Sequence, residues 1–250
     1  MRDIVRQRSG NPVLKEQTFR GLESTGAVMT IEGTVNRTYV LLLILLAGVA
    51  VTVVSDPRSI GLSVLVGAIG GLIVAIATVI RKQWAPITAP IYAFLEGLVV
   101  GGVSLVLENA YPGIVLPAVS LTFGTLFALL TVYRSGLIKV TDNFKLGVAA
   151  ATGAIFVVYV VDLVLSLVGA QVTFLHDAIF GNGLLGIGVS VVVIVVAALN
   201  LVLDFDFIEK GAEQRAPKYM EWYGAFGLLV TLVWLYLEIL RLLSKLRSRD

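Results

Sequence analysis

The stretch Asn200-Leu-Val-Leu-Asp204-Phe-Asp206-Phe-Ile-Glu209 ends a run of residues that is too apolar for a soluble protein, yet it carries two aspartates. A carboxylate at membrane depth costs about 2.5–3.5 kcal/mol on insertion scales unless it is paired, hydrated or protonated, and it therefore marks a candidate functional site. On a helix, Asn200 and Asp204 lie four residues apart and share one face, whereas Asp206 points nearly the opposite way. We therefore expect Asp204 to face the protein interior and Asp206 to pair with Lys210, four residues further on.

The composition is that of a polytopic membrane protein. Of the 250 residues, 57% are hydrophobic and 14% are charged, with a mean hydropathy of +0.92, whereas soluble domains carry roughly 25% charged residues. The chain has no cysteine and a single histidine, His176, which excludes disulfides, thiolate sites and metal sites built on a histidine pair. We expect His176 in a loop, and we expect no enzymatic activity, no cofactor and no nucleic-acid partner.

Seven apolar runs, each near the ~20 residues that a bilayer requires, predict an all-α fold of seven transmembrane helices. Residues 1–37 form a polar, basic tail before them, and residues 38–246 form a single transmembrane domain. The predicted helices cover residues 38–54, 59–80, 87–107, 114–133, 146–169, 184–203 and 223–243.

The basic residues outside the apolar runs predict the orientation in the membrane. Fourteen of the nineteen Lys and Arg residues lie in the N-terminal tail and in connections on the same side, including the segment 210–218. The positive-inside rule places this side in the cytoplasm and the segment 169–183 outside. Four basic residues after position 240 argue against an external C-terminus, so a seventh helix that does not fully cross stays an open alternative.

Glycines within the apolar runs predict close packing between helices, because small residues let two backbones approach in a membrane. These positions are Gly67, Gly70, Gly71, Gly101, Gly102, Gly147, Gly153, Gly186 and Gly188. The segment Gly181-Asn-Gly183-Leu-Leu-Gly186 formally matches the dinucleotide-binding fingerprint. It follows no strand and opens a membrane helix, so it lacks the physical basis of that motif.

Two further carboxylates lie on polar stripes of predicted helices. Glu96 follows Thr88 and Tyr92 at four-residue spacing, and Asp162 follows Tyr159 by three residues. Such stripes are compatible with structural hydrogen bonds inside the bundle or with the lining of a pore.

The C-terminal run carries a third stripe. Glu238 and Arg241 lie three residues apart and can neutralise each other, and Lys245 follows on the same face. The stripe is compatible with a static ion pair and with an internal hydrated path. Arg81 ends the second predicted helix, either as a topology anchor or as a partner for Asp204.

Several of these segments resemble the transmembrane Bax inhibitor motif family. The segment Leu203-Asp204-Phe-Asp-Phe-Ile208-Glu209 is similar to the Tyr-Asp-x-x-x-Ile element that closes the sixth helix of its members. The segment Leu235-Tyr-Leu-Glu238-Ile-Leu-Arg-Leu-Leu243 is similar to Leu-Tyr-Leu-Asp-x-x-Asn-Leu-Phe in their seventh helix. The resemblance extends to Ala93-Phe-Leu-Glu96-Gly97 and to the Arg81-Lys82 corner, and it covers most of residues 39–243.

The resemblance implies six helices around a central C-terminal helix and a pH-sensitive calcium leak. Asp204 and Glu238 fall on the aspartate pair that is thought to sense pH in the family, and Arg81 falls on the associated basic residue. This chain departs from the family pattern by Leu203 for tyrosine, Glu238 for aspartate, Arg241 for asparagine and an additional Asp206.

We therefore expect a calcium leak channel in a bacterial inner membrane, with its N-terminus in the cytoplasm. Asp204 and Glu238 would share a proton, since two like charges in a low dielectric cannot both ionise cheaply, and would contact calcium transiently as cargo. The predicted helix ends place the two residues at different depths, so they meet only if the seventh helix starts later than Tyr223, or is displaced or tilted. The alternatives are a proton-coupled carrier of a small solute and a regulator that binds a membrane protease or respiratory complex.

Overall fold

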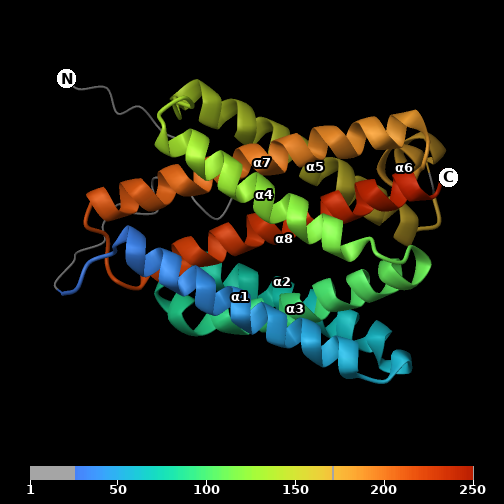
Figure 1. The fold of residues 1–250 in the computed structure, drawn as a ribbon, viewed down its shortest axis with the longest axis horizontal. Coiled ribbons are helices and arrows are strands. Elements are labelled where there is room, and N and C mark those ends of the chain that lie inside the picture. The colour runs from blue at the N-terminus through green and yellow to red at the C-terminus, as the bar shows by residue number, and fades with distance from the viewer. Residues whose placement is uncertain (1–25, 171, 250) are drawn as a thin grey trace. The chain divides into compact units, whose positions relative to one another are not determined.

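The computed structural model describes residues 26–170 and 172–249, and over these residues it contains eight α-helices and no β-strand (Figure 1). The all-α prediction is confirmed. The helices are α1 (Ile31–Val54), α2 (Ile60–Ile80), α3 (Ala85–Ala110), α4 (Val115–Arg134), α5 (Asp142–Leu167), α6 (Thr173–Phe180), α7 (Leu184–Glu213) and α8 (Met220–Arg247).

All of these helices except α6 are long and apolar enough to cross a membrane. Large apolar side chains such as Leu43, Leu72 and Phe156 are exposed on them, which would be unfavourable in water and is expected where lipid is the solvent. Helix α8 is the most buried of the seven, as the expected central position of the C-terminal helix implies. Its 28 residues are sufficient for a full crossing.

The helices extend beyond the apolar runs that predicted them. Helix α1 begins at Ile31 and not at residue 38. The Thr30 hydroxyl caps it by accepting a hydrogen bond from the Gly33 N–H at 2.9 Å. Helix α7 continues to Glu213, ten residues past the predicted end. The boundaries were wrong because an apolar run marks the part of a helix in hydrocarbon, whereas the helix ends at its capping group.

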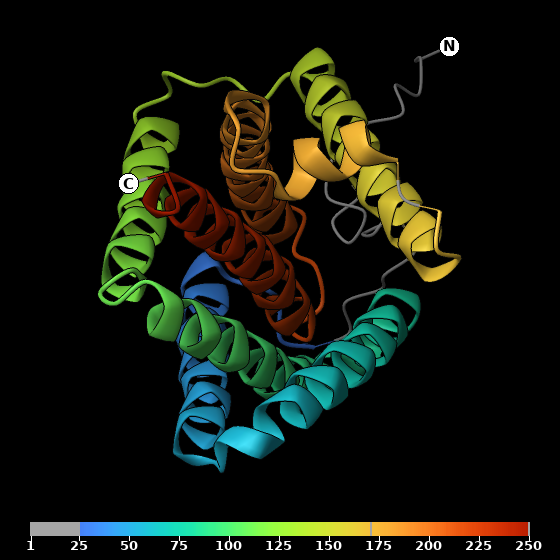
Figure 2. The same ribbon diagram turned by 90° about the vertical axis from the view of Figure 1, so that its right-hand side faces the viewer.

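The segment 169–183, expected to be a loop, contains α6. Gly169, with a φ of 74°, turns the chain after α5, and α6 then packs beside α5 (Figure 2). His176 therefore lies on a helix and not in a loop. The prediction failed because eight residues are too few to show an apolar period against the surrounding polarity.

The described chain divides into two compact units, each of which is described by itself. Unit 1 comprises residues 113–203 and 234–249, and unit 2 comprises residues 26–112 and 204–233. The predicted tail (1–37) and single transmembrane domain (38–246) are not tested by this division, and most of the tail lies outside the described residues.

In unit 2, α1 and α2 both pack against α3 (Figures 1 and 2). Glycine permits the α1–α3 contact, because a Cβ at Gly48 would meet the Phe94 carbonyl oxygen and one at Gly97 would meet that of Leu45. A Cβ at Gly67 of α2 would likewise meet the Leu95 carbonyl oxygen. The predicted role of glycine in helix packing is therefore confirmed for α2 and α3.

The same prediction is wrong for Gly147, Gly153 and Gly188, where an added Cβ would meet nothing within 4 Å. A small residue in an apolar run permits a close contact but does not create one, because the facing helix must also approach.

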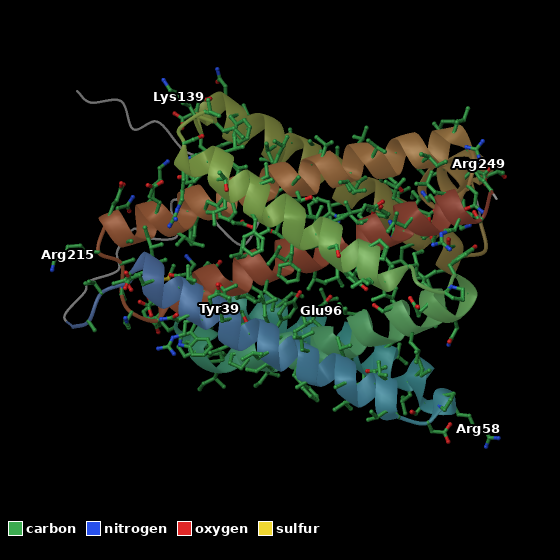
Figure 3. The ribbon with its side chains drawn as sticks, viewed as in Figure 1. Tyr39, Arg58, Glu96, Lys139, Arg215 and Arg249 are labelled. Atoms are coloured by element: carbon green, nitrogen blue, oxygen red, sulfur yellow. The ribbon has the colours of Figure 1, made fainter. Side chains whose placement is uncertain are left out.

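The start of α1 is joined to the α7–α8 connection within unit 2. The Met29 N–H donates to the Ala216 carbonyl oxygen at 2.7 Å, and the Lys218 N–H donates to that of Ala27 at 3.1 Å. Figure 3 shows Arg215 at this end of the unit and Arg58, in the α1–α2 turn, at the other. The described residues just before α1 therefore lie at the same end of unit 2 as the α7–α8 connection.

Candidate functional site

Asp204 lies in the middle of a part of α7 that is buried on every side. Asp204 is 0% exposed, and residues 200–208 are all buried. Asp206 is also buried, so the expectation that only Asp204 faces inward was wrong, because this part of α7 has no lipid-facing side. The predicted pair of Asp206 with Lys210 is confirmed, with 3.0 Å between Oδ2 and Nζ.

Asn200, one turn before Asp204, ties α7 to α5. Its Nδ2 donates to the Thr152 Oγ1 and to the Val196 carbonyl oxygen, each at 2.8 Å. Asn200 therefore acts as a structural hydrogen-bond donor on this face of the helix.

Glu238 is 2% exposed and lies in a network that joins α5 and α8 within unit 1. The Arg241 Nη1 lies 2.8 Å from Glu238 Oε2, which confirms the predicted pair. The Tyr159 hydroxyl donates to the same oxygen at 3.2 Å and accepts from Arg241 Nη1 at 2.6 Å. The Arg241 guanidinium also lies over the rings of Tyr159 and Phe180, 5.4 and 5.5 Å from their centroids. A buried carboxylate is therefore neutralised and held by groups from α5 and α8, and Phe180 of α6 contacts the guanidinium that neutralises it.

Asp162 and His176 form a second contact in unit 1. The buried Asp162 places its Oδ1 3.7 Å from the Nδ1 of His176 on α6, within ion-pair range if the imidazole is protonated. The only histidine of the chain is thus aimed at a carboxylate of a membrane helix.

The predicted stripe on α3 divides between two partners. The Tyr92 hydroxyl donates a hydrogen bond to the Glu96 carboxylate, as the four-residue spacing predicts. Thr88 instead donates to the Trp84 carbonyl oxygen at 3.1 Å and accepts from the Thr78 hydroxyl of α2 at 2.7 Å. Glu96 lies half-buried on α3 (Figure 3).

Arg81 lies exposed at the end of α2, with its guanidinium 5.5 Å from the centroid of the Trp84 ring. Its role in a pH sensor stays a prediction, and so does the pairing of Asp204 with Glu238, which belong to different units.

Sequence reasoning missed Glu221, a 1% exposed carboxylate in the first turn of α8. It accepts from the Thr30 N–H and hydroxyl at 3.1 and 2.9 Å and from Lys218 Nζ at 2.7 Å, and the Arg37 Nε lies 3.9 Å away. Gly33 is required beside it, because a Cβ there would collide with the Glu221 carboxylate. The three-residue spacing from Lys218 was the available signal.

In the part of the chain that the structure describes, no three His, Cys, Asp or Glu side chains gather as a metal site would require. The contact predicted for Asp204 and Glu238 is with a calcium ion that passes through and is not held. It stays a prediction.

The chain matches the family described as Bax inhibitor 1 like over residues 11–248. It belongs to this family. The Bax inhibitor 1 like match confirms the resemblance that the motifs around Asp204 and Glu238 carried, and it begins at residue 11, so it includes much of the basic tail that the resemblance left out. Comparisons with curated proteins and with solved structures gave no match.

Proposed function

We propose that this Bax inhibitor 1 like protein is a channel through which calcium leaks down its gradient in a pH-dependent way. The observation that supports it is that ionisable side chains are buried in helices apolar enough to span a bilayer, with Asp204 0% and Glu238 2% exposed. Such residues are costly in hydrocarbon and typically mark ion pathways or proton relays.

Unit 1 offers the groups that such a pathway needs. One face of α8 carries Glu238, Arg241 and Lys245 in succession. From α5, Tyr159 contacts Glu238 and Asp162 faces His176. Protonation of Glu238 would remove the charge that holds Arg241 and would free the guanidinium to move, which is how a proton changes the state of a gate. The family resemblance adds Asp204 as the second carboxylate, with which Glu238 would share the proton.

The test is calcium flux into proteoliposomes of purified protein, measured with an entrapped dye between pH 5.5 and 8. We expect Glu238→Gln and Asp204→Asn each to flatten the pH dependence, and the double variant to add little, since coupled groups are not additive. The matched control is Asp206→Asn on the same helix, whose carboxylate pairs locally with Lys210 and should leave the pH profile in place.

The outcomes separate the alternatives. Flux that saturates with substrate and moves protons in fixed ratio assigns a carrier. Absence of any flux from folded, inserted protein leaves a membrane protein that acts by binding others. Independent and additive effects of the two carboxylate variants contradict the shared-proton gate while leaving the channel in place.

A further inference from the structure

The glycine-rich segment between α6 and α7 that imitates a dinucleotide fingerprint has a different structural role. A Cβ at Gly181 would meet the Asp177 carbonyl oxygen, and one at Gly186 would meet that of Gly181. Glycine at 186 lets the first turn of α7 come into backbone contact with the end of α6, and glycine at 181 lets the chain leave α6 close to the Asp177 carbonyl oxygen. We call residues 179–190 the α6–α7 corner.

This tight corner directs three oxygens at a single point. The Ile179 carbonyl oxygen, the Gly186 carbonyl oxygen and the Ser190 hydroxyl oxygen lie 2.7, 2.9 and 2.9 Å from the Nζ of Lys245. These are the distances of hydrogen bonds from a charged donor, about 2.7–2.9 Å. An ammonium has three N–H donors, so each one has an acceptor.

The ammonium of Lys245 is bound by neutral oxygens, and the negative charge of Glu238 acts on it from beyond ion-pair distance. The residue is 2% exposed, and among the described residues its nitrogen has only these three neutral oxygens as hydrogen-bond partners. A buried ammonium is costly unless oriented dipoles replace its water. Ile179 lies in the last turn of α6, where the helix dipole presents partial negative charge. Backbone carbonyl oxygens fixed in this way replace the hydration shell of a monovalent cation in channel filters.

We propose that the α6–α7 corner is a binding site for a primary ammonium group, and that Lys245 is its covalently tethered occupant. By filling the site, Lys245 holds the end of α8 against α6 and α7 (Figure 1). It thereby acts as a positioning residue for the α8 stripe that contains Glu238. The site does not depend on calcium conduction, and its test needs no flux measurement.

The experiment is thermal unfolding of the detergent-purified protein with Lys245→Ala, followed in the presence of increasing n-propylammonium chloride. This ion is the fragment that the substitution removes. Sodium chloride keeps the ionic strength constant, and tetramethylammonium chloride supplies the same charge without an N–H donor. Lys139→Ala, which removes an exposed lysine of the same unit, is the matched control (Figure 3).

We expect Lys245→Ala to lower the unfolding midpoint by roughly 5 °C or more, since charged hydrogen bonds are lost. Propylammonium should raise the midpoint of this variant saturably, and it should not raise that of the wild type, whose site is filled. Equal effects of propylammonium and tetramethylammonium, or an equal effect on the wild type, would overturn the site.

Two further variants decide the question if Lys245→Ala does not fold. Lys245→Met keeps the aliphatic chain and removes the ammonium, so a midpoint equal to that of the wild type would show that packing alone is needed and would sink the proposal. Ser190→Ala removes one acceptor and keeps the lysine. It should lower the midpoint by less than Lys245→Met, and no change would contradict the three-oxygen site.

Discussion

At the scale of the residue, three buried charges of the described chain are compensated in different ways. Glu238 has a guanidinium and a phenol, Glu221 has two groups of Thr30 and an ammonium, and Lys245 has neutral oxygens. The kind of partner determines how much stability is lost when one member of the contact is substituted. Removing one partner of a buried charge leaves the other in a low dielectric, and that penalty usually exceeds the net value of the pair.

The clearest test of this at Glu238 is Tyr159→Phe, which deletes a hydroxyl that donates to Glu238 and accepts from Arg241. We expect the free energy of unfolding to fall by about 1.5–3 kcal/mol, because both lost hydrogen bonds involve charged groups. Tyr39→Phe is the control, since Tyr39 is exposed on α1 (Figure 3). Equal losses for the two variants in denaturant unfolding would show that the Tyr159 hydroxyl contributes nothing specific.

At the scale of the element, two properties of the helices decide the architecture. Their ends are fixed by capping groups such as Thr30 and Thr141 and not by the limits of the apolar runs. Their contacts are fixed by backbone approach, which in unit 2 requires glycine on both α1 and α3. In a membrane, where burial of apolar surface gives little preference between protein and lipid, this close approach supplies much of the attraction between helices.

Gly97→Ala tests the α1–α3 contact. The added methyl group would meet the Leu45 carbonyl oxygen, a backbone atom that cannot rotate away, so α1 and α3 must separate. We expect a loss of roughly 1–3 kcal/mol in the free energy of unfolding.

The matched control is Gly61→Ala in α2, where an added Cβ meets nothing within 4 Å. That change should be neutral or stabilising by about 0.5–1 kcal/mol, because alanine favours the helix. A Gly97→Ala variant as stable as Gly61→Ala would mean that the two backbones are not in contact.

At the scale of the whole molecule, the question is which end of the helices faces the cytoplasm. The positive-inside rule predicts a cytoplasmic N-terminus. The hydrogen bonds of Met29 and Lys218 place the α7–α8 connection at the same end of unit 2 as the start of α1. The C-terminal turn of α8 lies at the α6–α7 corner. In unit 1, the last turn of α8 and α6 are therefore on the same side of the unit.

This orientation can be measured because the chain contains no cysteine. Single cysteines at Arg215 and Arg58, both exposed and at opposite ends of unit 2 (Figure 3), can be labelled with an impermeant maleimide. On intact cells we expect labelling at position 58 and protection at position 215, and labelling of both after lysis. Labelling at position 215 from outside would reverse the orientation.

The sequence alone determined the class of the fold and the local pairs. A bilayer requires about 20 apolar residues for each crossing, so composition along the chain was sufficient to find seven helices. Helix geometry places residues three or four apart on one face, so the pairs of Glu238 with Arg241 and of Asp206 with Lys210 were also predictable.

Only the tertiary structure decided which distant residues meet. Tyr159 reaches Glu238 across 79 residues, His176 faces Asp162 from a helix that the sequence did not reveal, and three oxygens converge on Lys245. The apolar pattern could not specify these contacts, because lipid and protein interior are equally apolar and a membrane helix shows little difference between its packed and exposed faces. The partners of a buried charge therefore depend on how the helices pack.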